Sequence, residues 1–351
     1  MLRKKINTSI VCALLGVSSV KAQTDSTKPA PATNFTFSVD AYYRADFSNQ
    51  LSNNKTSFTN SNNSFELGMA SMRVDHSFGK ISATADLGFG RRAEEFSYND
   101  GAAGDGKNGI LTLAAVKQAY ISYAPSSAIK FTLGKWATHI GWELLDAYAN
   151  RNYSMSYGFS YGPFSHTGVK ADISLGGKTA LMVGVANPTD QATTMSSTKF
   201  AIAQLSTGTK DDKFKAYFNF QGAKDITQFD LVLNGIISDK FNIAYDGTVQ
   251  SVKAGSTESW SSNALYLNFD PTPKFGLTVR GEYFDNKKGA SSAPQAGIFA
   301  ATLSANIHID NLTIIPEFRL DNANENVFLK SDGLTGTKSA GCFLLAATYK
   351  F

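Results

Sequence analysis

The stretch FTFSVDAYYRADF, residues 35–47, alternates apolar and polar side chains along its whole length. Every odd-numbered position from Phe35 to Phe47 is apolar, and the positions between them carry Thr36, Ser38, Asp40, Tyr42, Arg44 and Asp46. Successive side chains of a β-strand point to opposite faces, so the segment predicts a strand with one face against an apolar medium and the other against water. The segment is longer than the usual strand of about 5–6 residues but suits a tilted membrane crossing.

The same alternation returns along the chain, for example in residues 81–89, 167–175 and 229–237. It predicts sixteen strands, near residues 35–48, 64–78, 80–92, 110–124, 129–135, 165–175, 179–186, 199–207, 214–222, 226–238, 241–253, 259–270, 275–285, 298–309, 311–321 and 340–351. Tight links rich in turn residues alternate with longer links. The sequence therefore predicts an all-β fold, a transmembrane antiparallel up-and-down β-barrel with short periplasmic turns and long extracellular loops.

The two ends of the chain carry the pattern of an exported barrel. Residues 1–22 combine a basic start, an apolar run too short for a helical span of about 20 residues, and a small-residue cleavage site, so they predict a cleaved signal peptide. Residues 23–33 are expected to form a flexible lead-in, and residues 34–351 the barrel. The final strand ends on Phe351, which resembles the terminal signature recognised by the outer-membrane assembly machinery. We expect the mature protein among the lipids of a Gram-negative outer membrane.

Charge and cysteine content argue against several classes of function. The chain has 33 Lys and Arg against 29 Asp and Glu, and the predicted leader holds four of the basic residues and no acid. Its removal leaves a formally neutral chain, which gives no support for nucleic-acid binding. Cys342 alone would remain after cleavage, so neither a disulfide framework nor a cysteine metal cluster is expected. The histidines lack metal-ligand spacing, and no cofactor is indicated.

A sixteen-strand barrel is too wide for side chains to fill and leaves an aqueous channel unless something plugs it. The residues expected to face inward are polar, and their opposite charges lie close together in the sequence. This pattern favours passive diffusion of small hydrophilic solutes and ions with weak ion selectivity. The expected pore-lining and constriction residues are Arg44, Asp86, Lys135, Glu143, Asp146, Arg151, His166, Lys170, Asp172, Asp230, Asp246, Arg280, Glu282, Glu317 and Arg319.

The longest link, residues 136–164, is rich in aromatic side chains and carries the charges Glu143, Asp146 and Arg151. Exposure of so many aromatic side chains to water would be unfavourable. We therefore expect the loop to fold inward against the barrel wall. Its charges would then lie at a constriction, where low-dielectric walls focus the electric field. The alternative is an extracellular loop that forms a subunit contact.

This region resembles a known family. The residues concerned are Gly134-Lys135-Trp136-Ala137-Thr138-His139-Ile140-Gly141-Trp142-Glu143, Asn152-Tyr153-Ser154, and Gly162-Pro163-Phe164-Ser165-His166-Thr167-Gly168. They are similar to a stretch between central strands of the OmpL-like β-barrel porins. The specific motif covers only about 35 residues, whereas the general architecture covers most of the mature chain. The resemblance implies a porin, and analogy with sixteen-strand trimers implies a homotrimer.

Two other functions are weighed against a porin. Gly158-Phe159-Ser160-Tyr161-Gly162 fits the G-x-S-x-G nucleophile pattern, and His166 is near in sequence. That pattern requires a strand–turn–helix of an α/β sheet, and the surrounding sequence does not predict one. The alternative function that uses this serine is a barrel-borne lipase or esterase. For His166 we expect a solvated place in the pore lining. A structural or adhesin barrel would instead have a blocked lumen and act through loops 49–63 and 322–339.

Overall fold

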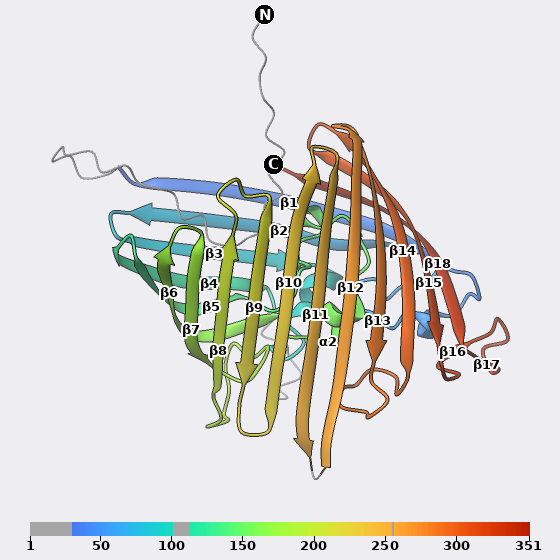
Figure 1. Ribbon diagram of the computed structural model, residues 1–351. Helices are drawn as coiled ribbons and strands as arrows, with labels where there is room; N and C mark the ends of the chain where they lie inside the picture. Colours follow the sequence, from blue (N-terminus) through green and yellow to red (C-terminus); the bar gives the residue numbers. More distant parts are fainter. Residues whose placement is uncertain (1–29, 101–112, 255) are drawn as a thin grey trace, which may run out of the picture.

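The alternating segments form long antiparallel strands that close into a barrel (Figure 1). The computed structural model describes residues 30–100, 113–254 and 256–351. Each strand pairs with its neighbours in sequence, and β1 closes the barrel on β18, with Ala41 opposite Ala347. This order confirms the predicted up-and-down barrel of sixteen strands.

The barrel strands are β1 (Ala32–Asp46), β2 (Ser64–Phe78), β3 (Ile81–Phe89), β4 (Val116–Ser126), β5 (Ile129–Ala137), β6 (Ser165–Gly176), β7 (Thr179–Ala186), β8 (Phe200–Gly208), β9 (Phe214–Gly222), β10 (Ile226–Ser238), β11 (Phe241–Ala254), β12 (Ser256–Thr272), β13 (Phe275–Asp285), β14 (Gly297–Ile309), β15 (Leu312–Ala323) and β18 (Ser339–Lys350). The links contain η1 (Leu51–Asn53), α1 (Arg91–Phe96), η3 (Ala147–Ala149), α2 (Tyr157–Tyr161), β16 (Phe328–Leu329) and β17 (Gly336–Thr337).

Some predicted boundaries differ from the structure. Strand β1 begins at Ala32, inside the expected lead-in. The third strand ends at Phe89 rather than 92, and Gly90 follows it with a φ of 120°. The position requires a glycine, because a Cβ there would lie 2.7 Å from the Gly68 carbonyl oxygen. Helix α1 follows directly. The link 322–339 contains a small hairpin of β16 and β17. The predicted signal peptide, most of the lead-in and residues 110–112 of the fourth expected strand lie outside the described residues.

The two faces of the strands differ as the alternation predicts. Phe35 and Val39 are exposed on the outer surface, whereas Asp40 and Arg44 of the same strand are buried on the inner side. Large apolar side chains continue around the outside, among them Phe65, Leu133, Phe229, Val279 and Phe318. Separately, no helix in the described part of the chain is both long and apolar enough to cross a bilayer.

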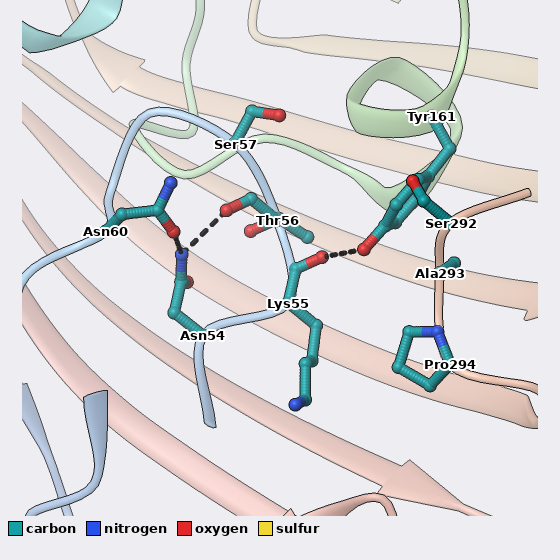
Figure 2. Close-up of a pocket in the computed structure, with 9 residues that line it drawn as sticks. All are labelled: Asn54, Lys55, Thr56, Ser57, Asn60, Tyr161, Ser292, Ala293 and Pro294. Atoms are coloured by element: carbon teal, nitrogen blue, oxygen red, sulfur yellow. Dashed lines mark hydrogen bonds between the residues drawn. The ribbon is translucent and has the colours of Figure 1, made fainter. Parts of the chain in front are cut away.

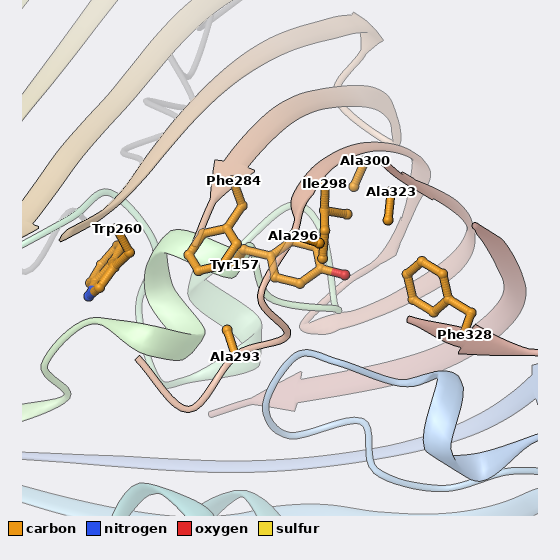
Figure 3. Packing of buried hydrophobic residues seen from close by; sticks show 9 residues of the cluster. All are labelled: Tyr157, Trp260, Phe284, Ala293, Ala296, Ile298, Ala300, Ala323 and Phe328. Atoms are coloured by element: carbon orange, nitrogen blue, oxygen red, sulfur yellow. The ribbon is translucent and has the colours of Figure 1, made fainter. Parts of the chain in front are cut away.

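Buried apolar clusters lie on the inner side of the wall. The cluster in Figure 3 joins Tyr157 of α2 with Trp260 of β12, Phe284 of β13 and Phe328 of β16. Tyr157 and Phe284 stack with their ring centroids 5.2 Å apart. This packing fixes α2 against β12 and β13 near the long-loop end of the barrel.

Candidate functional site

Residues 138–164, here called the inner segment, connect β5 to β6 and follow the inner face of the wall. Gly158 lies beside Ser262 of β12, whose Oγ would be 2.8 Å from a Cβ on the glycine. Farther along the same strand, Arg151 forms an ion pair with Asp270. The eight residue steps along β12 from Ser262 to Asp270 correspond to roughly 26 Å at the usual strand rise. The inner segment therefore reaches from the long-loop end of the barrel toward the short-turn end.

Wall carboxylates accept hydrogen bonds from the backbone of the inner segment. Glu317 of β15 accepts the N–H of Tyr153 at 2.8 Å and that of Ser154 at 3.1 Å. Glu282 of β13 accepts the N–H of Tyr157 at 2.7 Å. Buried backbone N–H groups need a partner, and hydrogen bonds to a charged acceptor are stronger than neutral ones. These acids thus replace the hydrogen bonds that an irregular chain cannot make to itself.

The next part of the wall, strands β9 to β11, holds the segment in the same way. Asp230 of β10 accepts the N–H of Gly141 at 3.0 Å, and Asp246 of β11 accepts the N–H of Trp142 at 2.9 Å. Asn219 of β9 also donates to Asp230. The inner segment is therefore held by a continuous stretch of the wall from β9 to β15.

All three charges predicted on the loop form ion pairs with wall residues. Glu143 pairs with Arg280 at 2.6 Å, and Asp146 pairs with Lys117 at 2.6 Å. Arg151 pairs with Asp270. Lys117 also lies 3.0 Å from Asp86. The structure thus joins Glu143, Asp146 and Asp86 to the wall's basic side chains, and Lys117 is a partner that the sequence analysis missed.

A chain of buried charges connects β13 and β15. Arg280 lies 3.2 Å and Arg319 3.3 Å from the same oxygen, Oε1 of Glu282. Arg319 also pairs with Asp321 at 2.9 Å and donates to the Met155 carbonyl at 2.9 Å. Charges removed from water are tolerated only when they are paired and hydrogen-bonded. The network satisfies this condition and fixes the path of residues 154–157.

Arg92 of α1 is a second residue that the sequence analysis missed. Its guanidinium donates to the carbonyls of Leu145 and Tyr153 at 3.1 and 3.3 Å. It also lies 5.0 Å from the ring centroid of Phe58 and 4.9 Å from that of Tyr153. Residues 91 and 92 were expected to end a strand, so only the tertiary fold shows that Arg92 contacts the inner segment.

The remaining predicted residues contact one another or other links. Arg44 donates to the Ser61 carbonyl at 2.9 Å, Lys135 pairs with Asp100 at 2.7 Å, and Lys170 pairs with Asp172 at 3.3 Å.

The expectation of a solvated His166 is wrong. The side chain is 1% exposed, and its Nε2 lies 3.0 Å from Thr138 Oγ1. The ring is also enclosed by His139, whose centroid is 5.0 Å away, and by Trp136 at 6.5 Å. The start of the inner segment therefore covers this part of the wall.

Few of the predicted lining residues are open to solvent in this structure. Arg280, Glu282, Glu317 and Arg319 are at most 4% exposed. Asp146 and Arg151 retain 20% and 23% side-chain exposure, and Lys170 retains 16%. Contact between a passing solute and the predicted lining residues stays a prediction. Asp146, Arg151 and Lys170 are the partly exposed residues that could make this contact.

Asp190, in the link after β7, holds the end of the inner segment. Its Oδ1 accepts the N–H of Phe164 at 2.6 Å and that of Ser165 at 2.8 Å, and its Oδ2 accepts the Tyr98 hydroxyl at 3.2 Å. Burial raises the pKa of Asp190 to about 7, although these hydrogen bonds favour its charged form.

The G-x-S-x-G serine is held by backbone groups. Ser160 Oγ donates to the Ser156 carbonyl at 2.7 Å and accepts the N–H of Ser57 at 3.0 Å. Because the Ser160 hydroxyl donates to a carbonyl and His166 Nε2 contacts Thr138, the structure does not join Ser160 and His166 as a nucleophile and its base. Within the described ranges, no group of three or more His, Cys, Asp or Glu residues is placed to hold a metal ion.

The closed sixteen-strand barrel, apolar outside and polar inside, is the architecture of an outer-membrane porin. The family model described as "Putative beta-barrel porin-2, OmpL-like" matches residues 32–351. The chain belongs to this family of OmpL-like β-barrel porins.

Solved structures share the fold at low identity. The trimer form of OmpT from Vibrio cholerae has 13% identity and a TM-score of 0.58, with 92% of this chain and 100% of that chain covered. An anion-selective porin from Comamonas acidovorans has 9% identity and a TM-score of 0.59, with coverage of 92% and 100%. OccK11 from Pseudomonas aeruginosa has 9% identity and a TM-score of 0.52, with coverage of 92% and 96%. No curated protein matches the sequence significantly.

Proposed function

We propose that the protein is a porin through which small hydrophilic solutes and ions diffuse passively across a Gram-negative outer membrane. The observation that carries this proposal is the closed sixteen-strand barrel with a polar inner wall. A barrel of this size encloses more space than its own wall side chains can fill. Membership of a porin family supports the same function. Ser160 of α2 and His166 of β6 are not paired as a nucleophile and its base, so we propose transport without chemistry.

The inner segment is proposed to form the constriction. Its hydrogen bonds to Glu317 and Asp246, on separate parts of the wall, support this role. Any passage must run beside the segment, past partly exposed groups such as Arg151 and Lys170. Because the charged groups occur in close pairs of opposite sign, their fields largely cancel at distances greater than the separation within each pair. Weak ion selectivity is the expected consequence.

Solute flux through proteoliposomes tests diffusion. Vesicles that contain the folded protein should release small neutral sugars, and the rate should fall as the size of the sugar increases. Vesicles with heat-denatured protein are the control. Equal rates in the two preparations would contradict diffusion and favour the adhesin-type barrel, in which the packed inner segment keeps the lumen closed. Esterase activity lost on Ser160→Ala would favour the enzyme instead.

We also propose that the barrels assemble as a homotrimer, as the trimer form of the Vibrio cholerae relative suggests. The exposed apolar belt would then contact both lipids and neighbouring subunits. Native mass spectrometry of the detergent-extracted protein tests this assembly, and a monomer at every detergent concentration would contradict it.

A further inference from the structure

A polar pocket of about 420 Å³ opens where three loops meet at the long-loop end of the barrel (Figure 2). Residues 54–60 form one side, Tyr161 of α2 forms the back, and residues 292–294 form the other side. The volume lies within the roughly 300–1,000 Å³ range of ligand sites. It exceeds the space that an inorganic ion needs, so it suits an organic solute.

The lining chemistry selects for negative charge. None of the lining residues is acidic, and Lys55 is their only cation. Among the described residues, the Lys55 ammonium has neither a hydrogen-bond nor an ion-pair partner, unlike Lys117 or Lys135. Burial lowers the pKa of Lys55, which reflects a desolvated and uncompensated charge. An anion in the pocket would compensate it.

Further polar residues line the same pocket as Lys55. Ser57 and Ser292 present hydroxyls at the pocket, and the Asn60 side-chain amide accepts from Asn54 with its oxygen, leaving its N–H₂ group as a donor. Tyr161 and Pro294 add two ring surfaces. A pocket lined by one cation, by residues with hydroxyl and amide groups, and by two rings matches a polyhydroxylated carboxylate better than a purely apolar ligand.

The pocket is held in shape before any ligand arrives. The Tyr161 hydroxyl donates to the Lys55 carbonyl at 2.7 Å, and Asn54 donates to the Thr56 carbonyl at 2.6 Å. Ala293 belongs to the buried cluster around Tyr157, shown in Figure 3. Binding to such a preorganised site loses little conformational entropy.

We propose that this pocket binds a small hydrophilic carboxylate of the sugar-acid class, with Lys55 as the group that recognises the carboxylate. Binding itself needs no open channel. The further step, delivery of the solute into the barrel, rests on the proposed function.

Ligand-observed NMR on the folded, detergent-solubilised protein tests the proposal with glucuronate as the probe. Glucose serves as the neutral sugar of the same ring size, and inorganic phosphate serves as an anion without a sugar ring. We expect saturation transfer to glucuronate. Phosphate should bind more weakly than glucuronate and therefore displace it only at higher concentration. Glucose should bind at least about tenfold more weakly than glucuronate, a ratio that corresponds to about 1.4 kcal/mol.

The variants Lys55→Gln and Ser292→Glu should each weaken glucuronate binding by about tenfold or more, the first by removing the cation and the second by adding a repelling carboxylate. Lys330→Gln removes the same charge from a loop residue outside the pocket and should bind like the wild type. Heat-modifiable electrophoretic mobility verifies that each variant is folded.

Equal binding of glucose and glucuronate, or unchanged binding in Lys55→Gln, would overturn the proposal. Tighter binding of phosphate than of glucuronate would also overturn the sugar-acid assignment. Because binding is measured without current or flux, a protein that binds glucuronate but does not conduct would contradict the porin function alone.

Discussion

The Glu143 carboxylate of the inner segment lies 2.6 Å from the Arg280 guanidinium of β13, and both side chains are buried. Arg280 also donates to the Ser154 carbonyl at 2.7 Å, and Glu143 accepts the N–H of Ser156 at 2.8 Å. This one pair therefore connects two stretches of the inner segment to each other and to the wall. The path of the constriction that we propose depends on it.

Substitution of Glu143 by alanine should destabilise the barrel and loosen the inner segment. Removal of one partner of a buried ion pair typically destabilises a protein by about 3–5 kcal/mol; we expect about 3 kcal/mol, because Glu282 still partners Arg280. Equilibrium unfolding and single-channel noise measure the two effects. Glu94→Ala, at an exposed position of α1, is the control. Equal stability and equal noise in both variants would show that the pair does not anchor the segment.

The pair of Arg151 and Asp270 should influence ion selectivity, because both side chains are partly exposed. Arg151→Gln leaves an unpaired carboxylate and should shift the reversal potential toward cation preference. Asp270→Asn leaves an unpaired guanidinium and should shift it toward anion preference. Shifts of the same sign, or none in either variant, would place this pair away from the ion path.

Asp190 should make the anchoring of the inner segment pH-dependent. Its pKa is about 7 in the folded protein, against an ordinary value of 3.8. A raised carboxyl pKa means that the folded state keeps a proton that the unfolded state releases. This contribution to stability is complete below about pH 3.8 and is lost as the pH rises to about 7. Tyr98 and Lys135 are the titratable groups that act on it.

Limited proteolysis between pH 4 and 8 can follow this loss, with cleavage of the inner segment read by mass spectrometry. Wild-type protein should become more sensitive as the pH rises, and Asp190→Asn should lose most of that change. A variant with the wild-type pH profile would assign the effect to another group.

Phe351 should matter more for assembly in cells than for the folded barrel. Its ring stacks on Phe37 with the centroids 5.4 Å apart, and its backbone exchanges hydrogen bonds with Phe37. Phe351→Ala keeps the backbone bonds, so refolding into detergent should proceed nearly as in the wild type. The amount of folded protein in the outer membrane should fall severalfold. Equal losses in vitro and in cells would instead indicate a role in stability.

The strands could be predicted because one face of each meets an apolar medium, and this requirement leaves a period-2 pattern in the sequence. Turn residues such as Gly176 and Gly177, both with positive φ, separate neighbouring strands and mark their ends. The aromatic content of residues 136–164 similarly predicted packing against the wall. These features are local, so a single sequence carries them.

The partners within the site could not be predicted, because they depend on which distant residues meet inside the barrel. Lys117 contacts Asp86 through strand pairing and Asp146 through the fold of the inner segment. Arg92 reaches the inner segment from a link whose helix has no strong periodic pattern. The burial of His166 likewise depends on Thr138 and His139 covering it, which alternation along β6 does not reveal.

The most direct test of passive diffusion is single-channel recording in planar bilayers, with reversal potentials measured under a salt gradient. We expect stable current steps and a reversal potential close to zero, because the charges along the inner wall are paired. Folded protein that inserts and carries no current would contradict the diffusion function. A reversal potential near the limit for a single permeant ion would contradict weak selectivity.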